Sequence, residues 1–260
     1  EEDDTKNIAI VGTRKATEMG KKRIDTLLHE LADTGYHPNI ISGLAYGIDI
    51  AAHTACVHYG LKAKAVLGHG LHMVYPASHK SMTEKILEQG GALISEFPTC
   101  AQVLPTNFLQ RNRIVAGMSE ATLVAESPVK GGAMSTARQA LSYNRDVMAI
   151  PGRPEDPTFA GCNLLIKQNI AALVENIKDL IRILNWPPLP TGPYQMSLDL
   201  FPVTNNEVLL METLLKRGEQ NIDQLHQLTR IPVHDLSVLL LKLELEGHVM
   251  QLPGNCYTLI

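Results

Sequence analysis

Short apolar segments of strand type alternate with helical segments through the first 184 residues of this chain. Residues 7–12, NIAIVG, have the pattern of a buried strand that ends at a glycine turn, and residues 18–34 that of a basic, amphipathic helix. Strand-type runs recur within 37–49, 63–71, 91–97, 120–127 and 145–152, and helical patterns run up to residue 59 and over 81–89, 108–118, 133–143 and 163–183. Because strands that alternate with helices form parallel sheets, we predict an α/β domain with a doubly wound parallel sheet over residues 1–184.

The pattern changes after Leu184. Residues 185–206 contain five prolines and no helical period, so they are predicted to form a proline-rich linker. Helical patterns follow at 207–217, 221–231 and from 232 onward, and two strand-type segments close the chain within 232–252 and at 255–260. Three helices and a terminal hairpin predict a small winged-helix domain over residues 207–260.

The predicted winged-helix domain is acidic. Residues 205–260 contain four Lys and Arg residues against seven Asp and Glu residues, which gives a net charge of −3. Its expected recognition helix has His234 and Asp235 where a protein that reads the DNA groove would have Arg, Lys or Asn. We therefore expect a protein contact or an accessory role for this domain.

The composition limits the classes of partner. The net charge of −4 predicts no general affinity for polyanions, so a nucleic-acid site would have to be a local patch. No apolar run approaches the length of a membrane span, and we expect no contact with a membrane. His69 and His72 have no third ligand near them, so we expect no metal. The four cysteines are scattered and include no CxxC pair; they are Cys56, Cys100, Cys162 and Cys256. We therefore expect no disulfide framework and a protein of the reducing cytoplasm.

Glycine-containing turns follow several of the predicted strands. In a parallel sheet the carboxyl ends of the strands meet at one edge, where ligands bind. The turns lie at 11–17, 42–49, 68–71, 126–136 and 151–154, and Arg14 and Lys130 add cations to two of them. Glycines let the backbone approach an anion, and helix N-termini direct N–H groups toward it, so the turns predict a phosphate site. The first turn has no GxGxxG motif, and the chain has neither a Walker motif nor a GxSxG motif.

Two arginines and two glutamates have alternative roles. In FLQRNRIVAG (108–117), Arg111 and Arg113 flank Asn112, and each could contact phosphate or pair with Glu96 or Glu126. The glutamates end strands, where they could serve acid–base chemistry, cap a neighbouring helix or pair with Arg113. Helical spacing directs the two arginines differently, so we expect Arg111 to point outward to the ligand and Arg113 to have a structural role.

Six motifs together resemble the DNA-processing protein A family (DprA, also called Smf). They are IAIVGTRKAT, SGLAYGIDIAAH, AVLGHGLHMVYP, SEFP followed by FLQRNRIVAGMS, GGAMSTARQA and AIPG, in the order of the family and within residues 7–180. The resemblance implies an extended Rossmann-like domain that binds single-stranded DNA, self-associates and helps load the RecA recombinase during natural transformation. It implies no cofactor and no enzymatic activity. Many members have a winged-helix domain, and many have a helical N-terminal domain that this chain lacks, so the chain could be a fragment of a longer protein.

The resemblance also implies roles for individual residues. Arg14, in the turn with Gly12 and Thr13, is expected to contact a phosphate, and Phe108 to stack on a base. Further contacts are expected from the matching turns, at Ser42, Gly43, Lys130, Gly131 and Gly132. The chain departs from the family where Gly131 and Ala133 replace serines and His72 replaces an acid.

Two other functions remain open. A related Rossmann-like family of nucleotide phosphoribohydrolases acts through a glutamate, but KGGAMSTARQA has Gln139 and no glutamate in register. The winged-helix domain could make the chain a transcription regulator, although its acidity argues against this. Because one cationic pocket holds a polyanion weakly in physiological salt, we expect a homodimer of the α/β domain.

Overall fold

The structure is a computed structural model that describes residues 6–186, 205–245, 248–252 and 254–259. The chain forms two compact units, Glu1–Leu189 and Pro190–Ile260, and each is described by itself. Most of the predicted linker, namely residues 187–204, lies outside the described residues, and the predicted domain boundaries at 184 and 207 stay predictions. In the described part of the chain, no helix is long and apolar enough to cross a membrane.

The first unit contains a seven-stranded parallel sheet with the strand order β4-β3-β2-β1-β5-β6-β7. Its strands are β1 (Asn7–Gly12), β2 (Asn39–Ser42), β3 (Ala63–Val66), β4 (Ala92–Ile94), β5 (Ala121–Glu126), β6 (Asp146–Ala149) and β7 (Ala172–Leu173). Along β1, Ile8 and Ile10 pack into one hydrophobic core while Ala9 and Val11 pack into another. This alternation with a period of two explains why the strand is apolar throughout, since both faces of the sheet are covered.

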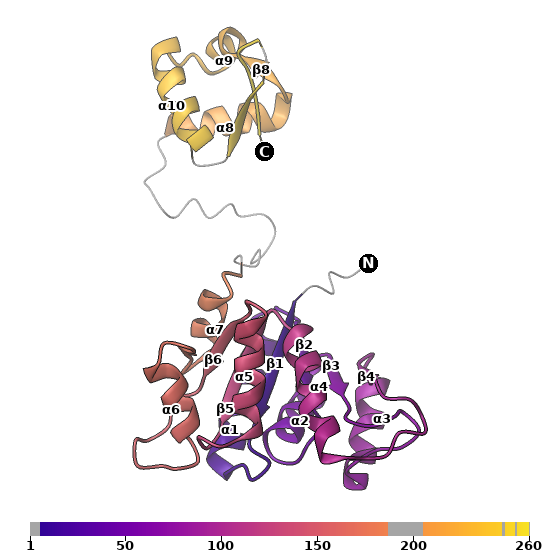
Figure 1. Cartoon of the computed structure of the whole chain (residues 1–260). Coiled ribbons are helices and arrows are strands. Elements are labelled where there is room, and N and C mark those ends of the chain that lie inside the picture. Colours follow the sequence, from indigo (N-terminus) through magenta and orange to yellow (C-terminus); the bar gives the residue numbers. More distant parts are fainter. Residues whose placement is uncertain (1–5, 187–204, 246–247, 253, 260) are drawn as a thin grey trace. The chain divides into compact units, whose positions relative to one another are not determined.

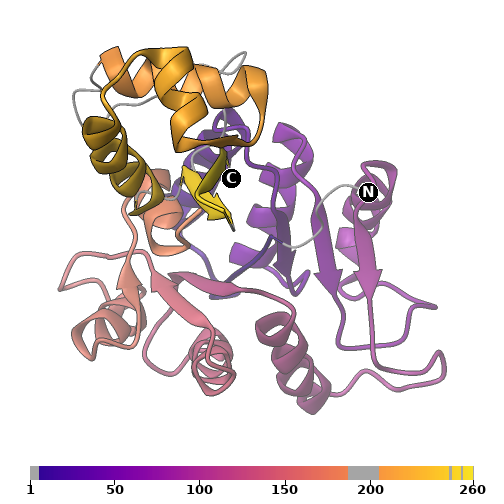
Figure 2. The ribbon, with the colours of Figure 1, turned by 90° about the horizontal axis from the view of Figure 1, so that it is seen from above.

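Helices cover both faces of the sheet (Figures 1 and 2). One layer contains α1 (Glu18–Asp33), α2 (Ile48–Tyr59), α3 (Lys80–Glu88) and α7 (Ile177–Ile183). The other contains α4 (Pro105–Gly117), α5 (Gly132–Ser142) and α6 (Ala160–Lys167). The prediction of a doubly wound, Rossmann-like α/β domain is therefore confirmed.

The winding direction of the sheet reverses at β1. The chain runs from β1 outward through β2, β3 and β4, and it then crosses to β5 on the other side of β1. The loops that follow β1 and β5 diverge at such a reversal, and this leaves a crevice at the carboxyl ends of the strands. The topology therefore selects the edge of the sheet where the turns of Arg14 and Lys130 meet.

The single helical segment predicted over 163–183 is wrong in detail. The structure divides it into α6, the short strand β7 and α7. Asn169, just beyond the end of α6, has a φ of 54°, which a continuing helix cannot accept. Asn176 then caps α7, because its side chain accepts hydrogen bonds from the N–H groups of Lys178 and Asp179.

The second unit has the predicted winged-helix arrangement. It contains α8 (Asn205–Arg217), α9 (Ile222–Thr229) and α10 (Val233–Leu245). A three-stranded antiparallel sheet is formed by β8 (Gln220–Asn221), β9 (Val249–Leu252) and β10 (Cys256–Leu259). Its core includes Leu210, Leu225 and Leu236, each fully buried and each from a different helix.

Candidate nucleic-acid interface

A cavity of about 280 Å³ lies at the carboxyl ends of the central strands. The turns after β1 and β2 form one part of its wall, and the turn from β5 to α5 forms another. One face of α4 closes the cavity. The cavity therefore occupies the crevice that the reversal of winding at β1 creates.

The cavity brings together most of the residues predicted to contact nucleic acid. Those that line it are Gly12, Thr13, Arg14, Gly43, Phe108, Arg111, Lys130, Gly131 and Gly132. Asn112, which was expected only to support the site, lines it as well. Ser42 is not among them, because its hydroxyl is buried and donates to the Ile10 carbonyl at 2.6 Å. Arg113, Glu96 and Glu126 also do not line the cavity.

Positive charge collects in the cavity although the whole chain is acidic. Its ionisable lining residues are Arg14, Arg111 and Lys130 against Asp49 alone, which gives 3 − 1 = +2 when all are charged. The chain as a whole has a net charge of −4. The local patch required for an anion site is therefore present.

Arg111 is buried, so the prediction that it points outward is wrong. Only 3% of the residue is exposed, and it shares the inner face of α4 with Asn107 and Val115, four residues before and after it. Its Nη1 donates to the carbonyl oxygens of Gly43, at 2.6 Å, and Val66. Within the described chain Nη2 has no hydrogen-bond partner, so its protons remain available to a ligand.

Asn112 and Gly43 hold the Arg111 side chain in place. The Asn112 side-chain oxygen accepts from Arg111 Nε at 3.2 Å. A Cβ atom added to Gly43 would lie 2.3 Å from Arg111 Nη1 and 2.5 Å from its Cζ. The residue after β2 must therefore be a glycine for the guanidinium to reach this position.

Asp49 is a lining residue that the sequence analysis did not single out, although it lies in the quoted SGLAYGID motif. Its Oδ2 accepts a hydrogen bond from the Ala45 N–H at 3.3 Å. Burial raises the pKa of the Asp49 carboxyl, and the nearby charge of Arg111 opposes this shift. Burial also lowers the pKa of the Arg111 guanidinium; Asp49 opposes that change and Arg14 adds to it. An anion in the cavity would relieve the repulsion between the two arginines.

Arg14 and Lys130 are the exposed cations at the mouth of the cavity. In the described part of the chain neither makes an ion pair. The Arg14 guanidinium lies over the ring of half-buried Phe108, 5.4 Å from the ring centroid. Near Lys130, α5 begins without a side-chain cap, and Gly131 and Gly132 line the cavity there. The helix N-terminus thus adds N–H donors to the side-chain cations.

The two glutamates support neighbouring elements. Glu96 pairs with Arg113 on the outer face of α4, where the side chains are 29% and 52% exposed. Fully buried Glu126 accepts hydrogen bonds from the N–H and the hydroxyl of Thr17, both at 3.0 Å. Thr17 itself caps α1, so Glu126 acts at a helix start, as one of its predicted alternatives required.

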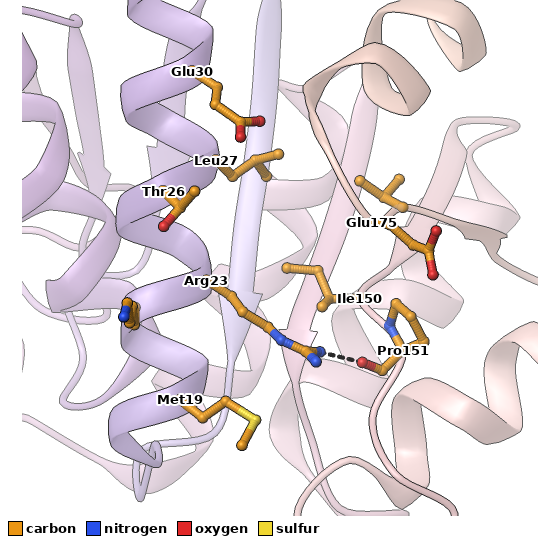
Figure 3. Close-up of a pocket in the computed structure, with 10 residues that line it drawn as sticks. Met19, Arg23, Thr26, Leu27, Glu30, Ile150, Pro151 and Glu175 are labelled. Atoms are coloured by element: carbon orange, nitrogen blue, oxygen red, sulfur yellow. Dashed lines mark hydrogen bonds between the residues drawn. The ribbon is translucent and has the colours of Figure 1, made fainter.

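A second cavity, of about 310 Å³, lies between α1 and the chain that follows β6 and β7 (Figure 3). Arg23 points into it, donates to the carbonyl oxygen of Pro151 and lies 5.4 Å from the Phe159 ring. Its charged lining residues are Lys22, Arg23, Glu30 and Glu175, whose charges cancel. This cavity therefore lacks the excess positive charge of the first.

Comparison with known proteins assigns both units to one family. Residues 1–185 match the family model for DNA recombination-mediator protein A, and residues 210–255 match that for the DprA winged helix domain. The chain is 33% identical to protein Smf of Synechocystis sp., with 96% of this chain and 69% of that protein covered.

Two solved structures are also similar. DprA from Streptococcus pneumoniae has a TM-score of 0.63 and 36% identity, covering 68% of this chain and 61% of that one. DprA from Helicobacter pylori, whose structure is described as revealing a single-stranded DNA binding mode, has a TM-score of 0.60 and 29% identity, covering 70% and 81%. The chain therefore belongs to the DNA recombination-mediator protein A family, which includes the DprA and Smf proteins.

Proposed function

We propose that this protein binds single-stranded DNA through the cavity at the carboxyl ends of β1, β2 and β5, and helps load the RecA recombinase onto that DNA during natural transformation. The observation that carries the proposal is the concentration of Arg14, Arg111 and Lys130 in one cavity of an acidic protein. Cationic side chains and the N-terminus of α5 suit backbone phosphates. The single-stranded DNA binding described for the H. pylori protein agrees with this assignment.

A single strand suits the cavity better than a duplex. The cavity combines cations with the aromatic ring of Phe108, and proteins that bind single strands combine a cationic groove with aromatic stacking. In the other unit, the exposed face of α10 presents Val238 and Leu241, 62% and 59% exposed, together with His234 and Asp235. None of these four residues is an Arg, Lys, Asn or Gln, the side chains that most often read base edges in a major groove, so we do not assign duplex recognition to this face.

We propose a binding role and no catalytic one. In a phosphoribohydrolase of related fold, a glutamate would act on the ribose. The corresponding stretch of this chain lies in α5 and contains Gln139, with no glutamate in register. The protein incubated with AMP is expected to release no adenine. Free adenine produced with enzymatic turnover would replace this proposal with a hydrolase.

The proposed active form is a homodimer of the α/β unit. One cavity with a charge of +2 grips a polyanion weakly at physiological salt, whereas two cavities on one strand gain from effective concentration. Sedimentation of the chain at micromolar concentration is expected to give twice the monomer mass. A strictly monomeric chain that still binds single strands tightly would exclude the dimer.

The direct test is a titration of the whole chain with a fluorescent single-stranded oligonucleotide and with a duplex of the same length, at several salt concentrations. We expect tighter binding to the single strand. Protection of one duplex sequence in a footprint would favour the transcription regulator, and equal affinity for both nucleic acids would contradict the preference for single strands. For RecA, we expect the protein to speed filament formation on single strands coated with single-strand-binding protein, and no acceleration would remove the loading role while leaving the binding role intact.

A further inference from the structure

Tyr75 is an exposed aromatic residue beside the cavity that no function considered above uses. It lies in the loop between β3 and α3, and 48% of it is exposed. Its ring centroid is 5.7 Å from that of Phe108, and the two ring planes are inclined by 46°. The aromatic wall of the cavity therefore continues outward from Phe108 to a second ring.

Phe108 is half-buried, and three groups lie close to its ring. The Arg14 guanidinium lies over the ring at 5.4 Å from its centroid. The backbone of Gly68 lies so close that an added Cβ would be 2.8 Å from one ring carbon and 3.2 Å from two others. Tyr75 is the third neighbour of the Phe108 ring. Of the two aromatic residues, Tyr75 is the more exposed.

The backbone of Tyr75 is held by a buried hydrogen-bond chain. The Tyr75 N–H donates to His69 Nε2 at 3.1 Å, and His69 Nδ1 lies 3.0 Å from the carbonyl oxygen of Gly70. His69 is only 1% exposed, and its own carbonyl accepts from the Ser95 hydroxyl at 2.6 Å. These bonds fit a His69 that has its proton on Nδ1 and accepts at Nε2. A ring on a fixed backbone loses little conformational entropy when a ligand stacks on it.

We infer that Tyr75 is a base-stacking platform for the single strand, next to the phosphate cavity on its β3 side. This inference rests on the function proposed above and adds the direction in which the strand leaves the cavity. The side chains of Arg14 and Tyr75 both contact the Phe108 ring. A phosphate bound near Arg14 and a base stacked on Tyr75 can therefore belong to one strand. Stacking does not depend on the base, so Tyr75 contributes affinity without sequence preference.

The test uses the whole chain and a labelled oligothymidine, with Tyr75→Leu and Tyr75→Phe compared. Leucine keeps an apolar side chain against Phe108 but has no ring, whereas phenylalanine keeps the ring. We expect Tyr75→Leu to weaken binding roughly 5- to 150-fold, the range for one stacked base, and Tyr75→Phe to stay within about twofold of the unchanged protein. The dependence of affinity on salt should not change, because Tyr75 carries no charge.

Tyr143→Leu is the matched control. Tyr143 is 45% exposed but lies at the C-terminal end of α5, away from the cavity at its N-terminal end, so its loss should leave binding unchanged. Photocrosslinking of the unchanged protein to an oligonucleotide that contains 5-iodouracil should attach the base to Tyr75, and this readout does not depend on how any variant folds.

The outcomes separate the two proposals. If the unchanged protein binds single strands but Tyr75→Leu binds equally well and no crosslink forms at Tyr75, the platform is wrong and the cavity proposal stands. If the unchanged protein does not bind single strands, both are wrong.

Discussion

Arg111 Nη1 donates a hydrogen bond of 2.6 Å to the carbonyl oxygen of Gly43, a residue 68 positions earlier in the chain. The bond joins α4 to the carboxyl end of β2 and places a buried cation at the wall of the cavity. The cavity is therefore lined by one buried cation, Arg111, and by two exposed cations, Arg14 and Lys130.

Gly43→Ala should disrupt this arrangement. The new methyl group would lie 2.3 to 2.5 Å from the guanidinium atoms of Arg111, so the side chain would have to leave its site. We expect a loss of about 1–3 kcal/mol in the free energy of unfolding, together with weaker binding to single strands. The fluorescence of Trp186, the only tryptophan, follows this unfolding because the residue is buried beside Tyr36 in the α/β unit.

Gly132→Ala is the control for that substitution. Gly132 lines the same cavity, but a Cβ added there meets no atom within 4 Å. The free energy of unfolding of the Gly132→Ala variant should be unchanged or slightly higher, because Gly132 is the first residue of α5 and alanine favours helix over glycine. Equal losses of stability in the two variants would show that the clash with Arg111 does not explain the effect of Gly43→Ala.

Arg14→Ala and Lys130→Ala should each weaken binding to single-stranded DNA without lowering the melting temperature. Both cations are exposed at the mouth of the cavity. Each substitution should reduce the slope of log affinity against log salt by roughly 0.7, the value for one single-strand phosphate contact. Lys22→Ala, in the second cavity, should leave the slope unchanged. Slopes unchanged in all three variants would mean that the strand binds elsewhere.

Glu126 and Glu96 should differ in their importance for stability. Glu126→Ala leaves the N–H and hydroxyl of Thr17 without their buried acceptor and should cost about 1–3 kcal/mol in the free energy of unfolding. Glu96→Ala removes an ion pair on the surface and should cost about 1 kcal/mol or less. Thermal unfolding followed by Trp186 fluorescence measures both, and a larger loss for Glu96→Ala would contradict the helix-capping role of Glu126.

His53 should make the α/β unit sensitive to acid. Burial, with smaller contributions from the charges of Arg111 and His79, lowers the pKa of His53 from 6.5 to about 3. Between these values the unfolded chain binds a proton that the folded chain does not, so the free energy of unfolding falls as the pH falls from 6.5 toward 3.

His53→Leu should remove this part of the pH dependence. Neither ring nitrogen of His53 has a hydrogen-bond partner among the described residues, so leucine loses no hydrogen bond there. Unfolding in urea at pH 7, 6, 5 and 4 should show that the variant loses less stability on acidification than the unchanged protein. Parallel pH profiles would contradict a neutral, buried His53.

The sequence by itself determined the strand and helix pattern. The apolar runs of β1 and β5 and the helical patterns before and after them predicted a parallel sheet, because these periodicities depend on local backbone geometry and on burial of one or both faces. The motifs also predicted which turns would meet, since the carboxyl ends of parallel strands share an edge. Ten of the predicted residues, Gly12 and Arg14 among them, line one cavity as a result.

Only the tertiary structure decided the direction and surroundings of particular side chains. The orientation of Arg111 depends on how α4 lies over β2 and β3. The contact of Tyr75 with Phe108 joins the loop after β3 to α4. The division of 163–183 into α6, β7 and α7 likewise depends on pairing of β7 with β6. Such contacts arise between residues distant along the chain, where packing outweighs local preference, so periodicity along the sequence cannot reveal them.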